Sequence, residues 1–266
     1  MKYNQLGKSD LTISEISFGC MSLQGSHEEN ARLLHQALDR GINFFDTADL
    51  YDKGQNEVTV GKAFKSMREQ VIIATKVGNQ WRPDGSGWDW NPTKAYILQA
   101  VEESLKRLQT DYIDLYQLHG GTIDDPIDET IEAFEQLKQQ GKIRYYGISS
   151  IRPNVIREYV KRSNIASVML QYSLLDRRPE EEVLGLLLQH QVGVLARGSL
   201  AQGLLAGKMA KPYLGYTSEQ VQQVSRAVTA SDAIRYVMQH PAVSSAVLGI
   251  RTGAHLHDAL TFAQAP

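Results

Sequence analysis

Residues 42–51 read INFFDTADLY, an apolar run that passes directly into two aspartates and a tyrosine. The isoleucine and phenylalanines at its start are typical of a β-strand. Because side chains alternate along a strand, Ile42, Phe44 and Asp46 share one face, and this apolar face ends in a carboxylate. Tyr51 follows five residues later, in the loop that the strand leads into.

Two later segments have the same design. In VIIATK (71–76), Ala74 shares a face with Lys76, and in YIDLYQLH (112–119) the corresponding face ends at His119. Three apolar strands are therefore predicted to end in ionisable side chains.

Strand-like runs alternate with amphipathic helical stretches along the chain. Helical periodicity is found near 27–40 and is clearest at 95–108, 128–140 and 180–190. The predicted strands are residues 16–20, 42–47, 71–76, 112–119, 143–149, 167–171, 192–196 and 245–249.

Eight strands separated by helices indicate parallel pairing with right-handed crossovers, in a chain of the usual size for a (β/α)8 TIM barrel. A doubly wound open α/β sheet is the competing architecture. The barrel is favoured because no GxGxxG motif follows the first strand and no linker divides the chain. We expect residues 1–266 to form a single barrel domain, with a short N-terminal β-hairpin within residues 3–13 capping its bottom.

The composition excludes several classes of protein. Hydrophobic residues make up 42% of the chain and the formal net charge is −2, so no nucleic-acid or membrane partner is indicated. The first ten residues lack the apolar stretch of a signal peptide, and a cytoplasmic protein is expected. Cys20 is the only cysteine, which excludes an internal disulfide. Nothing in the composition indicates an oligomeric state.

In a barrel of this kind, functional groups lie on the loops that follow the strands. Asp46, Lys76 and His119 are therefore expected to converge at the mouth, below Tyr51. A neighbouring ammonium lowers the pKa of a phenol, so Lys76, held charged by Asp46, suits Tyr51 to act as a general acid toward a carbonyl oxygen. His119 is placed to orient that oxygen. No side chain supplies a hydride, so a nicotinamide cofactor is implied.

These residues resemble the aldo-keto reductases over nearly the whole chain. The matching motifs, in family order and spacing, are Asp-Thr-Ala-x-x-Tyr at 46–51, IIATKVG at 72–78, SLKRLQTDYIDLYQLH at 104–119, GKIRYYGIS at 141–149 and GLLAGK at 203–208. The resemblance, to bacterial NADPH-dependent members, implies NAD(P)H extended across the top of a barrel and catalytic roles for Asp46, Tyr51, Lys76 and His119.

The resemblance also implies contacts to the carboxamide of the cofactor. Ser149 matches the serine of the family's Ser-Asn pair, and Ser150 stands in place of the asparagine. The glutamine expected on the next strand falls at Met169, whereas Gln171 lies two residues on and shares that face.

The end of the seventh strand departs from the family pattern. Where the family usually has Ala-Tyr-Ser, this chain has Ala196, Arg197 and Gly198. We predict that the planar guanidinium of Arg197 replaces the stacking ring, and that its charge speeds the release of the cationic oxidised cofactor. The alternative is that Arg197 pairs with an acid at the barrel rim.

After the eighth strand, Gly249, Ile250 and Arg251 resemble the family's Gly-x-Arg that grips the adenosine 2′-phosphate, and His255 lies one helical turn on. A cation and a helix N-terminus both favour a phosphate, so NADPH is expected, with NADH less favoured. The other residues expected at the cofactor are Gly19, Cys20, Met21, Asp46, Gly198, Ser199, Leu200, Gln202 and Asp258.

Other residues admit two interpretations. Trp81, Trp88 and Trp90, in the loop 78–92, either line a hydrophobic substrate pocket or fix the loop.

His255 and His257 diverge by about 200° on a helix, so no metal site is expected from them.

The sequence thus predicts NADPH-dependent reduction of small-molecule aldehydes, with ketones as further candidates and detoxification of reactive aldehydes as a role. The alternative hypothesis is a cofactor-sensing regulatory subunit that binds partner proteins and turns over slowly. The chain ends soon after the last predicted helix, without the long C-terminal loop of many relatives, so an open pocket of broad specificity is expected.

Overall fold

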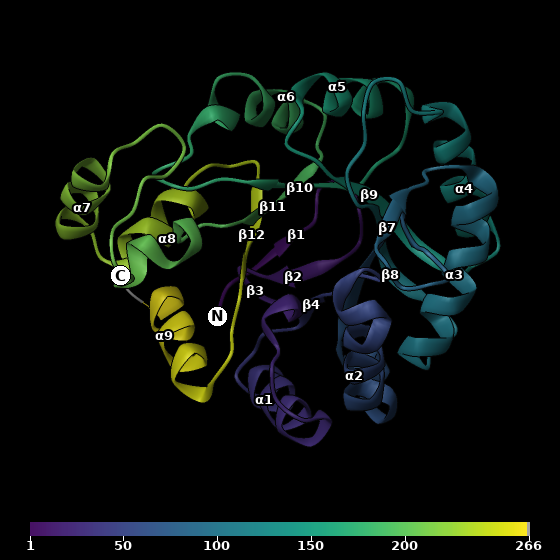
Figure 1. Ribbon diagram of the computed structural model, residues 1–266, viewed down its shortest axis with the longest axis horizontal. Helices are drawn as coiled ribbons and strands as arrows, with labels where there is room; N and C mark the ends of the chain where they lie inside the picture. Colours follow the sequence, from purple (N-terminus) through teal and green to yellow (C-terminus); the bar gives the residue numbers. More distant parts are fainter. Residues whose placement is uncertain (265–266) are drawn as a thin grey trace.

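Eight parallel strands close into a barrel in a computed structural model, which describes residues 1–264 (Figure 1). The pairings of β12 with β3 and of β9 with β10 complete the ring, which confirms the (β/α)8 barrel and excludes the open sheet. In chain order these strands are β3 (Ile16–Gly19), β4 (Phe44–Asp46), β5 (Ile72–Val77), β8 (Ile113–Leu118), β9 (Ile143–Ser149), β10 (Ser167–Gln171), β11 (Gly193–Arg197) and β12 (Val243–Leu248).

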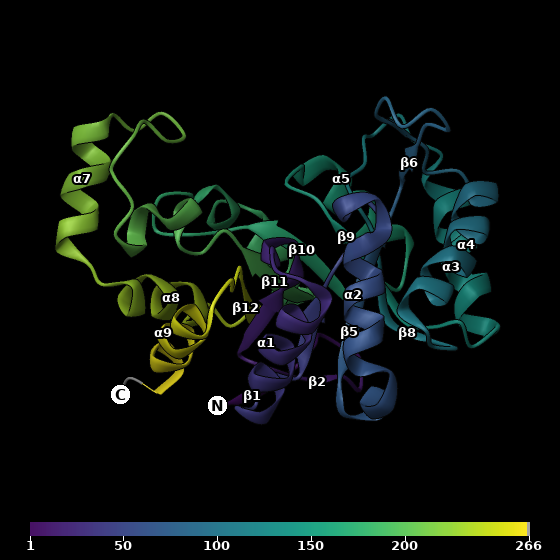
Figure 2. The same cartoon turned by 60° about the horizontal axis from the view of Figure 1, so that its bottom comes forward.

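Helices surround the barrel. They are α1 (His27–Asp39), α2 (Gln55–Phe64), α3 (Lys94–Leu108), α4 (Ile127–Gln139), α5 (Pro153–Arg162), α6 (Val183–Gln189), α7 (Ser218–Ala227), α8 (Ala230–Met238) and α9 (Gly253–Gln264). Each view places α7 at the edge of the molecule furthest from α3 and α4 (Figures 1 and 2). Within the described residues, none of these helices is both long enough and apolar enough to cross a membrane.

Local sequence signals set the start of α1. Ser26 accepts a hydrogen bond from the amide of Glu29, and the carboxylate of Glu29 accepts one from the amide of Ser26. This reciprocal cap satisfies two backbone donors that a helix start otherwise leaves free. Leu33, Leu34 and Ala37 then recur at helical spacing and pack into the layer between helices and barrel.

The predicted N-terminal hairpin is present and fills the lower end of the barrel. Strands β1 (Tyr3–Gln5) and β2 (Thr12–Ser14) pair antiparallel. At the turn, Gly7 has φ +55°, and a Cβ there would lie 2.4 Å from the carbonyl oxygen of Ala166, so only glycine fits. The hairpin side chains Leu6, Leu11 and Ile13 form one apolar cluster with the inward side chains Phe44, Ala74, Leu115, Met169, Leu195 and Val247.

Polar side chains stand directly above this inward row. Five strands carry a polar residue at their C-terminal end, on the same face as the inward side chain two residues earlier. Those inward side chains are Phe44, Ala74, Leu115, Met169 and Leu195. The polar residues are Asp46, Lys76, Gln117, Gln171 and Arg197. The fold thus gathers these side chains at the upper mouth of the barrel, as the alternation predicted for the first two.

The tryptophan-rich loop has structure that the sequence did not indicate. Strands β6 (Asn79–Trp81) and β7 (Trp88–Trp90) pair antiparallel and form a small hairpin above the barrel mouth (Figure 2). Five short 3-10 helices complete the described chain: η1 (Cys20–Ser22), η2 (Tyr51–Gly54), η3 (Lys65–Gln70), η4 (Arg178–Glu180) and η5 (Ala201–Ala206).

Candidate active site

A buried lysine lies at the centre of the mouth. The Lys76 ammonium donates hydrogen bonds to Asp46 Oδ2 at 2.7 Å, to the Thr47 carbonyl at 2.8 Å and to Tyr51 Oη at 3.2 Å. Only 1% of Lys76 is exposed. A buried ammonium is tolerated when it is paired and all its donors are used, and these three acceptors meet that condition.

The ion pair keeps Lys76 charged. Burial acts to lower the pKa of Lys76, but Asp46 and the phenol oxygen of Tyr51 outweigh it, so that pKa is raised above its ordinary value. Burial also raises the pKa of Asp46, while Lys76 and a hydrogen bond from Gln117 oppose the rise. Because the oxygen and nitrogen are 2.7 Å apart, we assign the charged pair.

His119 lies beside the phenol, directly after β8. Its amide donates to the Val77 carbonyl at 2.8 Å, which holds the backbone against β5. The imidazole meets the Tyr51 ring edge to face, with centroids 5.8 Å apart. Burial, then Lys76 and Arg197, lower the pKa of His119 to about 3, so the ring is neutral near pH 7. Its Nδ1 is buried and has no partner among residues 1–264.

Two groups at this centre were not identified from the sequence as site residues. Gln117 is fully buried and its Nε2 donates to Asp46 Oδ1 at 3.3 Å, the carboxylate oxygen that Lys76 leaves free. The carbonyl of Thr47 takes one donor of Lys76. Gln117 shares the inward face with Leu115 and was detectable by alternation, whereas a backbone carbonyl carries no sequence signal.

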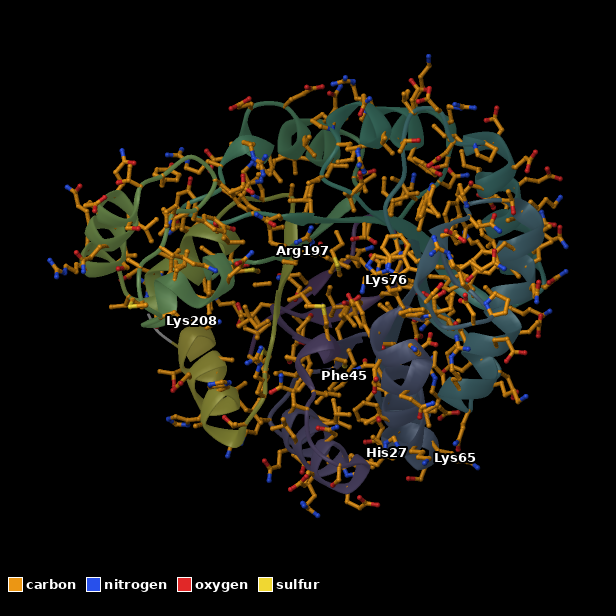
Figure 3. All side chains as sticks on the ribbon, in the orientation of Figure 1. His27, Phe45, Lys65, Lys76, Arg197 and Lys208 are labelled. Carbon is orange, nitrogen blue, oxygen red and sulfur yellow. The ribbon has the colours of Figure 1, made fainter. Side chains whose placement is uncertain are left out.

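A second polar cluster lies across the mouth, at the ends of β10 and β11. Gln171 and Arg197 are neighbours in the sheet register, and Arg197 Nη1 donates to Gln171 Oε1 at 3.2 Å. Gln171 Nε2 in turn donates to Asp176 Oδ2 at 2.9 Å and to Tyr213 Oη at 3.0 Å. Within residues 1–264, Arg197 has no carboxylate at ion-pair distance. The alternative that Arg197 pairs with an acid at the barrel rim is therefore not supported. Figure 3 shows Arg197 and Lys76 in the middle of the ring of helices.

Ser149 is the last residue of β9, and Ser150 directly follows it. The Ser150 amide donates to the Met169 carbonyl at 3.0 Å, which ties this strand end to β10. Ser150 is buried, and its Oγ accepts a hydrogen bond from the Arg152 amide at 3.2 Å. Ser149 is half-buried.

The loop after β3 has one buried and one exposed candidate. Cys20 is fully buried behind Gly19, and burial, followed by Asp46, raises the pKa of its thiol well above the usual range. The thiol is therefore an unreactive packing group. Met21 is 69% exposed and is available to a ligand.

The loop after β11 contains left-handed backbone. Gly198, Ala201, Gln202 and Gly203 all have positive φ. Ser199 is buried, and its hydroxyl donates to the Ala196 carbonyl at 3.3 Å. Leu200 is half-buried and Gln202 is exposed.

The residues predicted at the phosphate lie around the start of α9. Arg251, His255 and Asp258 are exposed, and the His255 amide donates to Thr252 Oγ1 at 3.2 Å. Gly249 is exposed as well, but Ile250 is buried in the helical layer, so its side chain is turned away from any ligand on the surface.

One of the three tryptophans follows the second interpretation, in which the ring fixes the loop. Trp90 Nε1 lies 3.0 and 3.1 Å from the two carboxylate oxygens of Asp125, so Trp90 fixes the loop. Trp81 faces the turn after Tyr51, where the Lys53 ammonium lies 5.3 Å from its ring centroid. Trp88 is exposed.

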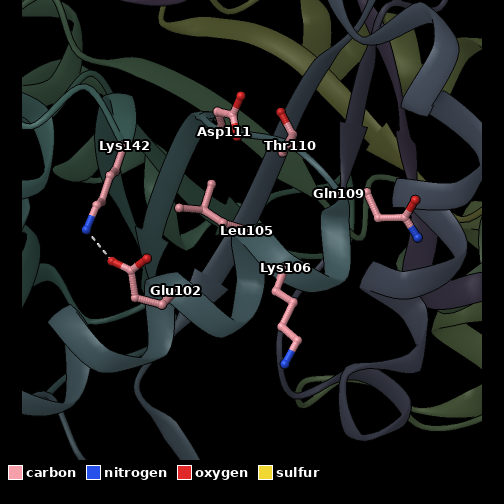
Figure 4. A pocket seen from close by; sticks show the side chains of 7 residues that line it. All are labelled: Glu102, Leu105, Lys106, Gln109, Thr110, Asp111 and Lys142. Atoms are coloured by element: carbon pink, nitrogen blue, oxygen red, sulfur yellow. Dashed lines mark hydrogen bonds and ion pairs between the residues drawn. The ribbon is translucent and has the colours of Figure 1, made fainter.

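Two hollows accompany the barrel. One of about 580 Å³ borders Tyr51, Asp52 and Gln55 and extends along the start of α1. The other, about 490 Å³, lies near the lower end, where α3 leads into β8, and an ion pair between Glu102 and Lys142 crosses it (Figure 4). No group of three or more His, Cys, Asp or Glu side chains in residues 1–264 is arranged to hold a metal ion.

The fold and this site define a class of protein that comparison with known sequences also identifies. Residues 15–266 match the Aldo/keto reductase family, and the chain belongs to it. It is an NAD(P)H-dependent oxidoreductase of that family.

Three relatives show the extent of the similarity. The chain is 51% identical to the uncharacterized oxidoreductase YqkF of Bacillus subtilis, covering all of this chain and 92% of that protein. It superposes on the holo form of the aldo-keto reductase AKR11C1 from Bacillus halodurans with a TM-score of 0.97 and 51% identity, covering 100% and 92% of the two chains. It is 35% identical to the NADH-specific methylglyoxal reductase of Escherichia coli, over 80% of this chain and 72% of that one.

Proposed function

We propose that this protein reduces aldehydes, with ketones as further substrates, by NADPH-dependent hydride transfer with Tyr51 as the general acid. The observation that carries the proposal is the position of the Lys76 ammonium, which bonds both Asp46 and Tyr51 at the barrel mouth. Reduction of a carbonyl requires a hydride at carbon, which the nicotinamide supplies when bound, and a proton at oxygen.

Tyr51 supplies that proton. As the carbonyl oxygen becomes an alkoxide, the phenol gives up its proton and becomes a phenolate. The Lys76 ammonium, 3.2 Å from the phenol oxygen, stabilises this phenolate. Asp46 keeps the ammonium in place and charged, and Gln117 and the Thr47 carbonyl fix the pair. Solvent restores the proton of Tyr51 after the reaction.

His119 orients the substrate and does not act as the acid. With a pKa of about 3 it carries no proton to donate as an imidazolium at neutral pH. The neutral ring still offers one N–H donor beside the phenol, and that donor suits the carbonyl oxygen. Its position against Tyr51 supports this role.

The residues around the mouth fit a nicotinamide nucleotide. Ser149, Ser150 and Gln171 would hold the carboxamide, for which Gln171 Oε1 keeps a second lone pair beside its bond from Arg197. Arg197 would stack on the nicotinamide, since its guanidinium reaches the mouth and pairs with no carboxylate in residues 1–264. The loop residues Met21, Gly198, Leu200 and Gln202, which are exposed or half-buried, would line the rest of the dinucleotide.

The preference for NADPH rests on Arg251. It is exposed beside the first turn of α9 and forms no ion pair within the described part of the chain, so it is available to a 2′-phosphate. His255 lies on the same helix turn, and Asp258, further along α9, would lie near the adenine. One relative is named as NADH-specific, and a direct comparison of the two cofactors is therefore part of the test.

The test follows the near-ultraviolet absorbance of the reduced cofactor with a panel of aldehydes and ketones, using NADPH and NADH in parallel. We expect rapid oxidation of NADPH with aldehydes, and a lower kcat/KM with NADH. The absence of turnover with every carbonyl would overturn the proposal. A sizing column run beside the assay shows whether the active species is free of partner proteins.

A further inference from the structure

The turn that follows Tyr51 has an unusual backbone. Asp52 has φ 47° and ψ 43°, Lys53 has φ 51° and ψ 41°, and Gly54 has φ 84°. Two consecutive residues with side chains thus adopt the left-handed conformation, which costs free energy and persists only where the surroundings impose it.

The side chain of Arg107 packs against this turn. Arg107 is in the last turn of α3, and a Cβ on Gly54 would lie 2.8 Å from both its Cδ and its Nε. Further along α2, a Cβ on Gly61 would lie 2.6 Å from the Arg107 carbonyl oxygen. The two glycines therefore let α2 and the turn approach α3 so closely that the stem of Arg107 fills the space behind the turn.

Glu57 holds Arg107 in that position. Arg107 Nε donates to Glu57 Oε2 at 2.7 Å, and Glu57 is fully buried. The other oxygen, Glu57 Oε1, accepts from Thr75 Oγ1 at 2.5 Å. Thr75 directly precedes Lys76 in β5, so these contacts run along the outer face of the strand whose inner face carries Lys76.

A second buried acid lies nearby without weakening this pair. Asp49 is 7% exposed, and its Oδ1 is buried with no partner among residues 1–264. Burial, and then Glu57, raise the pKa of Asp49 well above its usual range. The raised pKa disfavours a second negative charge beside Glu57, and the 2.7 Å contact assigns the ion pair with Arg107 to Glu57.

We infer that Arg107, held by Glu57, is a positioning residue that keeps the turn 52–54 in its left-handed form and thereby holds Tyr51 at Lys76. The inference rests on the proposed role of Tyr51 in reduction. The groups proposed to bind the cofactor lie on other strand ends, so loss of Arg107 lowers kcat while cofactor binding is retained.

The test compares Arg107→Met with Arg107→Lys and with Lys106→Met. Methionine keeps the length of the stem without charge or donors, and lysine keeps stem and charge without the planar donor group. Lys106 is exposed on the same helix turn and serves as the matched control for a lost cation. Each variant is assayed for kcat, for the KM of a reference aldehyde and for NADPH affinity by fluorescence quenching.

We expect kcat of Arg107→Met to fall by roughly tenfold to a hundredfold, the range for a catalytic group displaced by about 1 Å. NADPH affinity should stay within about twofold, and Arg107→Lys should recover part of kcat. Lys106→Met should match the wild type. A folded Arg107→Met enzyme with wild-type kcat overturns the inference, even if its melting temperature is lower.

Two further measurements keep the result decisive. Should Arg107→Met fail to fold, Glu57→Gln, which keeps the size of the side chain and its bond from Thr75, takes its place and should lower kcat in the same way. Amide hydrogen exchange of residues 51–57 should be faster in Arg107→Met than in Lys106→Met. This readout needs no activity, so an unchanged exchange rate contradicts the positioning role, whereas an inactive wild type contradicts the proposed function.

Discussion

The Lys76 ammonium lies 3.2 Å from the phenol oxygen of Tyr51, at the top of an inward row that is otherwise apolar. The two residues come from different strand ends and meet only because β4 and β5 are neighbours in the barrel. This relationship allows the proposed chemistry to be tested one atom at a time.

Tyr51→Phe removes the phenol oxygen, which is both the proposed proton donor and one of the three acceptors of the Lys76 ammonium. The variant should bind NADPH as the wild type does, measured by fluorescence quenching, because the ring and its surroundings are kept. Carbonyl reduction should fall by about 10² to 10⁴ fold, the usual contribution of a positioned general acid. A normal rate of aldehyde reduction in Tyr51→Phe would remove Tyr51 from the mechanism.

Lys76→Met should affect both rate and stability. Removing one partner of a buried ion pair leaves Asp46 uncompensated and destabilises a protein by about 3 to 5 kcal/mol, which urea unfolding can measure. Asp46→Asn in the same chain should restore much of that stability, because no lone buried charge remains, but should not restore activity. Recovery of activity in the double variant would contradict the role of the ammonium.

The depressed pKa of His119 predicts a pH dependence with a defined sign. Since the folded ring titrates at about pH 3 and an unfolded histidine at about 6.5, the unfolded state binds the extra proton between these values. The contribution of His119 to the free energy of unfolding is therefore fully present above about pH 6.5. It is lost as the pH falls below that value, by at most about 1.4 kcal/mol per pH unit.

Unfolding of wild type and His119→Gln across this range tests the prediction, because glutamine cannot titrate. The difference between the two stability curves should change with pH only below about pH 6.5. The pH profile of the reduction rate should show no inflection near pH 6.5 that depends on His119. The profiles of wild type and His119→Gln should therefore have the same shape near that pH. Such an inflection would show that His119 titrates as an ordinary histidine.

Arg197→Tyr should slow release of the oxidised cofactor. The guanidinium places a positive charge against the cationic nicotinamide, and tyrosine substitutes a neutral stacking ring. Stopped-flow traces should show release slower by roughly threefold to tenfold, since even about 1 kcal/mol of repulsion changes a rate by this much. Arg197→Lys, which keeps the charge, should release the cofactor rapidly, and identical traces for all three proteins would dismiss the stacking role.

Arg251→Gln should weaken binding of NADPH and leave NADH nearly unaffected. Loss of a charge-assisted bond to a phosphate costs about 1.5 to 3 kcal/mol, or roughly tenfold to a hundredfold in Kd. Arg226→Gln, an exposed arginine on α7, is the control for a lost surface cation. Equal losses for both cofactors would show that Arg251 does not read the 2′-phosphate.

Strand alternation accounts for how much of this site is visible in the sequence. Asp46 and Lys76 could be placed at the mouth because each lies two residues beyond an inward apolar side chain, a purely local pattern. The register of the barrel then brings them together. The hairpin β6–β7 escaped prediction because glycines and a proline between its short strands are equally typical of an irregular loop.

The cluster behind the turn shows where local patterns fail. Arg107 and Glu57 occupy helical positions that usually carry solvated charges, and nothing within either helix indicates that they meet. Their contact depends on the close approach of α2 to α3 at Gly54 and Gly61, which is a tertiary property. Likewise, the bond between Arg197 and Gln171 requires adjacent strands in one particular register.

The N-terminal hairpin also constrains how protons travel. Leu6, Leu11 and Ile13 pack with the inward side chains beneath Lys76 into one apolar cluster, which disfavours the passage of water to the phenol from below. Tyr51 is therefore expected to regain its proton from the upper side, where reactants enter and depart. While substrate or product fills the opening on that side, Tyr51 has only one proton to donate. The product must therefore leave before the next catalytic cycle can begin.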